Sequence, residues 1–212
     1  MTADPHPSTG PVRVDVDALA TAAAAAVDAD QVLRLTRDLV RIRSVWDEAT
    51  GANEEEAAGY VARVLRDLGL HVFVEEVAPG RPNVIADWSG HRFVAGRDRT
   101  LMFEGHTDVV TEGDPASWTR DPYAASLEHD ADGGTRLFGR GSADMKAGVA
   151  AAIAALDAVR RSTPNLAGRV RMGIVVDEEG MMSGIKDFVA RGWANDVDGA
   201  IVCEPEELEL CL

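Results

Sequence analysis

The spacing of apolar residues along the first 70 positions predicts two long helical stretches. The first runs from about Val16 to Val45, with a break near Asp28–Asp30. Its second half carries an apolar stripe at helical spacing, which consists of Val32, Leu35, Leu39 and Ile42. The second helix begins after Asn53, a residue type that caps helices, and ends at Gly69. Its expected buried face consists of Ala57, Val61, Val64, Leu65 and Leu68.

After position 70, short apolar and β-branched segments predict strands. These segments are His71–Val77, Asn83–Trp88, Thr100–Glu104, Val170–Val176 and Ala200–Cys203. Two further segments, Ala125–His129 and Arg136–Phe138, predict a hairpin around Asp132-Gly133-Gly134. Helices are expected directly after Asp144 and over Ile185–Ala190.

The alternation of strands and helices is typical of the α/β class. Val170–Val176 is almost entirely apolar, as in a strand that is covered on both faces. We therefore predict an α/β fold with a largely parallel mixed sheet covered by helices on both faces. In such sheets, ligands bind at the carboxyl ends of the strands.

The first 30 residues are interpreted as a leader segment, partly disordered, because Met1–Pro11 contains three prolines. Ala18–Val27 weakly resembles a signal peptide, but acidic residues precede it where a signal needs positive charge. No run of 18 apolar residues predicts a membrane span. Two cysteines, Cys203 and Cys211, make no disulfide framework. We therefore expect a cytoplasmic protein without a membrane partner.

The charge balance excludes one class of partner. The 212 residues include 21 Lys and Arg against 36 Asp and Glu, for a formal net charge of −15. Binding to nucleic acid needs clustered Lys and Arg to neutralise phosphates, so no nucleic-acid partner is expected. The acidic balance suits carboxylates gathered around a cation.

Chemically versatile side chains follow the ends of the predicted strands. Thr100–Glu104 is followed by His106 and Asp108, Val170–Val176 by Glu178 and Glu179, and Ala200–Cys203 by Glu204. A glycine-rich loop, which begins at Gly139, leads to Asp144 before the next helix. Because strand ends of one direction meet at one edge of a sheet, these residues are predicted to share a rim.

Each of these signals also has a simpler interpretation. Asp144 could cap the following helix, and His106 with Asp108 could be a surface histidine beside an acid. Glu178 and Glu179 could lie in a solvated acidic loop, and Glu204 precedes Pro205 as in an ordinary turn. Their common position is the reason to prefer a metal site. Histidine and carboxylate donors suit Zn²⁺, with Co²⁺ or Mn²⁺ as alternatives.

The order of these motifs resembles the M20 metallopeptidases. The residues that carry the resemblance are Glu104-Gly105-His106-Thr107-Asp108, Gly139-Arg140-Gly141-Ser142-Ala143-Asp144-Met145-Lys146, Asp177-Glu178-Glu179 and Cys203-Glu204-Pro205. Arg81-Pro82-Asn83 and Trp118-Thr119-Arg120-Asp121-Pro122 are also similar to the family. Gly113-Asp114-Pro115 with Trp118 resembles the acetylornithine deacetylase and succinyl-diaminopimelate desuccinylase branch.

The resemblance implies a role for each site residue. His106 and Glu204 would bind one metal ion, Asp144 would bridge two, and Glu179 would bind the second. Asp108 would orient His106, and Glu178 would be the general base. A cis peptide is expected at Asp144–Met145. The implied activity is hydrolysis of an amide bond by metal-activated water, on a small N-acyl amino acid or a dipeptide, with two Zn²⁺ ions in a complete site.

The sequence departs from the family in one respect. The family places a further histidine ligand near its C-terminus, whereas no histidine follows Glu179 here. The resemblance therefore implies a truncated, zinc-peptidase-like domain over residues 31–207, with 208–212 beginning the link to an absent lid domain. Homodimers are expected through that lid, and the 212-residue chain by itself is expected to be inactive. The alternatives are a catalytically silent metal-binding domain and an acidic α/β protein that binds no metal.

Overall fold

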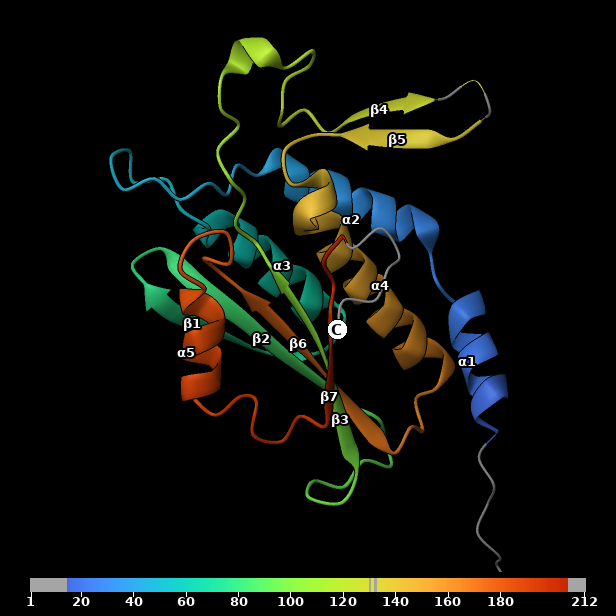
Figure 1. Ribbon diagram of the computed structural model, residues 1–212. Coiled ribbons are helices and arrows are strands. Elements are labelled where there is room, and N and C mark those ends of the chain that lie inside the picture. The colour runs from blue at the N-terminus through green and yellow to red at the C-terminus, as the bar shows by residue number, and fades with distance from the viewer. Residues whose placement is uncertain (1–14, 130, 132, 206–212) are drawn as a thin grey trace, which may run out of the picture.

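Five strands form the central sheet of the computed structural model, in the order β1-β2-β6-β3-β7 (Figure 1). They span His71–Ala78 (β1), Arg81–Ser89 (β2), Gly168–Val175 (β6), Arg99–His106 (β3) and Gly199–Val202 (β7). The structure describes residues 15–129, 131 and 133–205. β2 is antiparallel to β1 and β6, while β3 is parallel to β6 and β7. Four strands therefore share one direction, which confirms the predicted largely parallel mixed sheet.

Two strands extend beyond their predicted ends. β2 begins at Arg81 instead of Asn83, because Pro82 pairs with Glu76 in β1 next to a register shift. β3 continues past Glu104 to His106, which pairs with β6 at Val175. The histidine is therefore the last residue of a strand rather than part of a loop.

Helices cover the sheet on both faces, as predicted (Figure 1). On one face α2 (Ala29–Arg41), α3 (Glu55–Asp67) and α4 (Ala147–Ser162) form the larger core with β2 and β6. On the other face α5 (Ser183–Ala190) packs through Phe188 against Ile85, Met102 and Val175. β7 is the exception, since all four of its residues are exposed; Ile201 is 47% and Val202 is 57% exposed.

The predicted first helix is confirmed as two, α1 (Val16–Ala25) and α2, separated at the expected break. It ends at Arg41, however, and not at Val45. Ile42 adopts extended backbone, and Ser44 then bonds to the chain beyond β3: its hydroxyl donates to the carbonyl of Thr107 and its carbonyl accepts from the amide of Val109. These tertiary bonds outweigh the local helical pattern. The first 14 residues of the predicted leader lie outside the described residues.

A separate hairpin stands away from the main sheet (Figure 1). Its strands are β4 (Ser126–His129) and β5 (Thr135–Phe138), which confirms the predicted pairing. Asp132, in the predicted turn, lies outside the described residues. In the described part of the chain, no helix combines the length and the hydropathy that crossing a membrane requires.

A charged contact fastens the long loop between β3 and β4. Glu112 accepts hydrogen bonds from Arg43 at 3.2 and 3.1 Å and from the Tyr123 hydroxyl at 2.9 Å. The hydrogen bond from Arg43 lowers the pKa of Glu112 to about 2. The loop is thereby tied to the segment that follows α2.

Replacing Glu112 with glutamine is expected to destabilise the fold near neutral pH and to have no effect near pH 2. A lowered folded pKa stabilises the protein above the ordinary value of 4.5, and this contribution disappears as the pH falls from about 4.5 to about 2. Because Arg43 is 37% exposed, solvent screening limits the effect to about 1 kcal/mol. Urea unfolding at pH 7, 4 and 3 measures it. A difference between the two proteins that stays constant across this range would contradict the assignment.

Candidate metal centre

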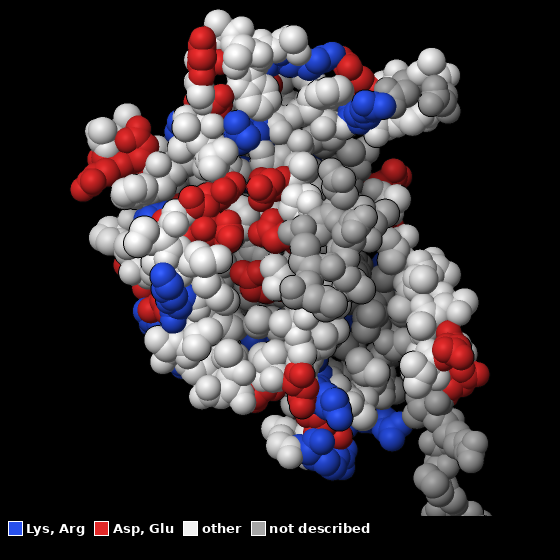
Figure 2. All heavy atoms as spheres, in the orientation of Figure 1, with Lys and Arg blue, Asp and Glu red and all other residues white. Residues whose placement is uncertain are grey.

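The parallel strands bring three chain segments to one edge of the sheet. β3 ends at His106, Asp177–Glu179 follow β6, and Glu204 follows β7. His106 Nε2 lies 3.3 Å from Asp144 Oδ1, 3.3 Å from Glu204 Oε1 and 3.7 Å from Glu178 Oε2. Acidic side chains gather in the middle of the face shown in Figure 2. The predicted rim of strand ends is therefore present in the structure.

His106 is held with one ring nitrogen toward the protein and the other toward the carboxylates. The residue is 1% exposed. Nδ1 lies 2.9 Å from the backbone carbonyl of Asp108, and 3.4 Å from the Asp108 carboxylate. We assign the Nδ1 proton to the bond with the carbonyl, which leaves Nε2 as a free donor of electrons. The predicted orienting role of Asp108 would therefore involve its main-chain carbonyl as well as its carboxylate.

The Asp108 carboxylate has a different contact. Its Oδ2 accepts a hydrogen bond from the amide of Glu179 at 3.0 Å, so it links the end of β3 to the turn after β6. Burial raises the pKa of Asp108, but the nearby imidazole of His106 and its positive charge outweigh this, and the pKa is lowered overall. Asp108 is therefore an anion beneath the histidine.

Asp144 lies in an irregular turn, Ser142–Lys146, ahead of α4. Its backbone is extended (φ −111°, ψ 103°), and the Asp144–Met145 peptide is cis, as the family resemblance implied. The helix-cap interpretation is wrong: α4 begins at Ala147, and no described helix amide donates to the Asp144 side chain. The next turn needs glycine at Gly148, where a Cβ would lie 2.1 Å from the carbonyl oxygen of Cys203. The Asp144 side chain is 54% exposed beside His106.

The three groups His106, Asp144 and Glu204 have the chemistry of a divalent-cation site. One donor atom from each lies within 4.8 Å of the others. His106 Nε2 is buried and has no hydrogen-bond partner in the described part of the chain. A buried polar atom without a partner is costly, and here it points at two carboxylates. An imidazole with two carboxylates is a donor set that suits Zn²⁺ or Mn²⁺.

The shifted pKa values of Glu104, Glu204 and His106 also indicate that this edge of the sheet favours positive charge. Burial raises the pKa of Glu104 and of Glu204 to about 7 in each case. Burial lowers the pKa of His106, but the hydrogen bond and charge of Asp108, together with Glu204, raise it to about 9. The carboxylates therefore stabilise a cation at the imidazole, and a metal ion would compete there with a proton.

The two adjacent glutamates differ in position. Glu178 faces His106 at 3.7 Å and is 30% exposed. Glu179 is outside the group of three donors, although the charge of Asp144 is among the causes that raise its pKa, after burial. The structure therefore brings Glu178 to the centre and leaves Glu179 outside the group of three donors.

Two buried groups, Glu104 and Lys146, belong to the motifs that resemble the family, but the resemblance implied no role for them. Glu104 is 8% exposed and contributes another carboxylate beneath the site. Lys146 is fully buried; its Nζ donates to the carbonyl of Ile42 at 2.8 Å, and burial lowers its pKa to about 7. The apolar spacing of the neighbouring helix gave no sign that this lysine would point inward.

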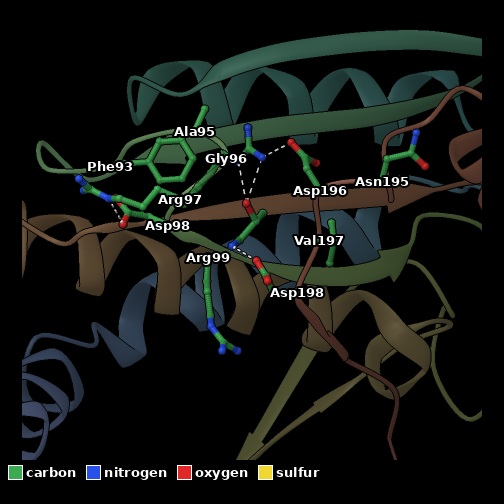
Figure 3. A pocket seen from close by; sticks show the side chains of 12 residues that line it. Phe93, Ala95, Gly96, Arg97, Asp98, Arg99, Asn195, Asp196, Val197 and Asp198 are labelled. Carbon is green, nitrogen blue, oxygen red and sulfur yellow. Dashed lines mark hydrogen bonds and ion pairs between the residues drawn. The ribbon is translucent and has the colours of Figure 1, made fainter.

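A second hollow lies at the opposite edge of the sheet, where β3, β6 and β7 begin (Figure 3). Several of its charged groups already have partners: Arg169 contacts Asp196 and donates to Thr100, and Asp198 accepts from the Thr100 amide. Because these groups already have partners within the chain, this hollow is a weaker candidate for a ligand site than the strand ends.

Comparison with known proteins identifies relatives of the chain. The family model described as peptidase family M20/M25/M40 matches residues 102–211. A succinyl-diaminopimelate desuccinylase from Cereibacter sphaeroides is 44% identical over 147 residues, which cover 69% of this chain and 34% of that protein. The chain thus spans about a third of the length of this curated relative.

Solved structures share the fold at low sequence identity. A di-peptidase from Saccharomyces cerevisiae superposes with a TM-score of 0.69 at 17% identity, covering 89% of this chain and 40% of that one. A protein from Bacillus subtilis, described as a dinuclear metal-binding peptidase of the M20 family, gives a TM-score of 0.53 at 16% identity and covers 82% of this chain and 42% of that one.

Proposed function

Because the chain belongs to the peptidase family M20/M25/M40, we propose that it is the N-terminal part of a metal-dependent amidohydrolase. The substrate class is a small N-acyl amino acid or a dipeptide, with N-succinyl amino acids as the first choice because of the desuccinylase relative. The observation that carries the proposal is the unpartnered Nε2 of His106 among the carboxylates of Asp144, Glu204 and Glu178.

Within this proposal, His106, Asp144 and Glu204 hold the first cation. Asp144 would also hold a second cation together with Glu179, with a further ligand supplied by the rest of the longer protein. The bound cations would polarise the amide carbonyl and acidify the attacking water. Zn²⁺ is the preferred ion on donor type, with Co²⁺ and Mn²⁺ as alternatives.

Glu178 is the proposed general base. Its carboxylate lies beside the candidate ligands and is partly exposed, so it can reach a water at the site and exchange protons with solvent. It would take a proton from the attacking water and return it to the leaving amine. Asp108 keeps the His106 ring oriented through its carbonyl and aligns Glu179 through its carboxylate.

Space for a substrate exists next to the centre. A hollow of about 270 Å³ is lined by Asp108 and Glu179 and also by the exposed side chains of Trp46 and Val110. An apolar wall beside charged groups suits a ligand with both an aliphatic chain and polar ends.

Removing metal is expected to abolish the proposed activity of the full-length protein. Hydrolysis of N-succinyl and N-acetyl amino acids and of dipeptides would be followed before and after dialysis against a chelator, and again after adding Zn²⁺ or Mn²⁺. Activity should fall by more than about 10³-fold and return with the ion, because water is then activated only by side chains. Hydrolysis that survives chelation would contradict a metal-dependent mechanism.

Asp144→Ala should weaken metal binding more than Asp108→Ala. Asp144 offers a carboxylate to the cations directly, whereas Asp108 acts through the imidazole and an amide. Loss of a supporting group costs about 10- to 100-fold in metal affinity, and loss of a direct ligand costs more. Competition titration with a zinc-sensitive dye gives both affinities. The reverse order would show that Asp144 is not a ligand.

A further inference from the structure

Arg81, at the start of β2, is a buried cation held between carboxylates from two distant parts of the chain. Its side chain is 10% exposed. Nε donates to both oxygens of Glu54 at 3.1 and 2.9 Å, and Nη2 donates to Asp177 Oδ1 at 2.9 Å. The ring of Trp46 covers the guanidinium at 4.8 Å. The segment before α3, the start of β2 and the turn after β6 therefore meet at one guanidinium.

Asp177 in turn organises the segment that carries the two candidate glutamates. Its Oδ2 accepts hydrogen bonds from the amides of Met181 and Ser183, each at 3.3 Å, and its carbonyl accepts from the amide of Met182 at 2.7 Å. Asp177 also has a φ of 64°, a left-handed conformation that is uncommon for a residue with a Cβ. Such a conformation persists only where surrounding contacts enforce it.

Asn83, two residues after Arg81, holds both ends of the same turn. Its Oδ1 accepts from the amide of Val176 at 3.1 Å, and its Nδ2 donates to the carbonyl of Gly184 at 2.8 Å. Val176 and Asn83 lie so close to Gly184 that a Cβ at Gly184 would be 2.2 Å from the Val176 carbonyl oxygen and 2.8 Å from Asn83 Oδ1. Glycine is therefore required where the turn leads into α5.

The sheet topology explains why these two side chains can act together. β2 is antiparallel to β6, so the start of β2 lies beside the end of β6. Residues 81 and 83 have the same side-chain direction in a strand, and both reach the turn at residues 176–184. Neither contacts a candidate metal ligand through its side chain.

We propose that Arg81 and Asn83 are positioning residues that fix the turn at residues 176–184, and with it Glu178 and Glu179, against the metal centre. The relevance of this clamp to catalysis rests on the function proposed above. Its structural part does not, because all of the contacts lie within this chain and need no metal ion. Arg81 sets the conformation at Asp177, and Asn83 sets the distance between the two ends of the turn.

Amide hydrogen exchange in the metal-free 212-residue protein tests the clamp. In Arg81→Met, the amides of Met181 and Ser183 should exchange at least about tenfold faster, while amides in β3 and α4 keep their rates. In Asn83→Ala, the amide of Val176 should show the same local increase. Arg81→Lys should give an intermediate rate, because one ammonium cannot donate to Glu54 and Asp177 with the same geometry.

Arg171 provides a matched control. It is 4% exposed and is also paired with two carboxylates, Asp87 at 2.7 Å and Asp196 at 2.8 Å, but it does not contact the turn. Arg171→Met should leave exchange in the turn unchanged relative to the rest of the chain. In Arg81→Met, an equal increase in the exchange rates of all amides, as in a general loss of stability, would overturn the proposal. Unchanged exchange rates in the turn would overturn it as well.

Two additions keep the outcome decisive. If Arg81→Met does not fold, Glu54→Gln keeps the shape of the side chain and weakens its bond to the guanidinium without changing a residue of the turn; an unaltered exchange rate at Met181 would then overturn the clamp. In the full-length protein, Asn83→Ala should lower kcat while KM changes little, because Asn83 does not line the proposed substrate hollow and base placement is affected more than binding. Absence of metal binding in the unmodified protein would instead contradict the proposed function and leave the exchange result valid.

Discussion

Replacing Glu178 with glutamine in the full-length protein is expected to lower kcat by about 10²- to 10⁴-fold, with metal content unchanged. The substitution keeps the size of the side chain and removes its ability to accept a proton. Glu178 lies 3.7 Å from His106 Nε2, farther than the carboxylates of Asp144 and Glu204 at 3.3 Å, which suits a base next to the ligands more than a ligand.

Glu179→Gln is the matched control for this experiment. The two glutamates are adjacent in one turn, so both changes remove one charge from the same segment. Glu179→Gln should reduce the amount of bound metal, whereas Glu178→Gln should not. Steady-state kinetics combined with elemental analysis separates the two results. Normal turnover in Glu178→Gln would refute its role as the base, and a loss of metal would move it to the ligands.

His106→Ala is expected to reduce bound zinc to the background level in the 212-residue protein. The imidazole supplies the one nitrogen donor of the candidate site, and the remaining carboxylates of Asp144 and Glu204 are 54% and 23% exposed. Exposed carboxylates without that nitrogen bind divalent ions weakly. Elemental analysis after dialysis against zinc, compared with the unmodified chain, gives the result directly.

A second measurement guards against unfolding of the variant. Zinc at a hundredfold excess over its dissociation constant should stabilise the unmodified chain by about 2.7 kcal/mol, and His106→Ala not at all. His129→Ala, which removes an exposed histidine on the hairpin, should behave like the unmodified chain. Equal and negligible zinc in all three proteins would eliminate the metal site and favour the acidic protein without a metal.

The gathering of the site residues could be predicted because it depends on strand order and direction alone. A strand that ends in a histidine and two that end in carboxylates will share a rim once they are parallel neighbours. Sequence periodicity locates the strands well enough for this, even where their ends are off by two residues, as at His106. Which carboxylate binds and which accepts a proton remains a prediction from the family.

Contacts between distant segments could not be predicted from local patterns. Glu54 directly follows Asn53, the expected cap of α3, yet it is fully buried and pairs with Arg81, 27 positions later. Asp144 follows the pattern of a helix cap, but α4 begins only at Ala147, after an irregular turn that contains Asp144. In both cases a tertiary partner outweighs a local preference, and a single sequence carries no record of that partner.

The exposure of β7 has a consequence for the solubility of the 212-residue protein. Strand edges that are not covered pair readily with other chains, and β7 adds exposed Ile201 and Val202 to its open edge. The 212-residue protein should therefore self-associate at high concentration through a continuous intermolecular sheet. Replacing Ile201 with Asp or Lys should delay this self-association and leave the candidate metal centre intact.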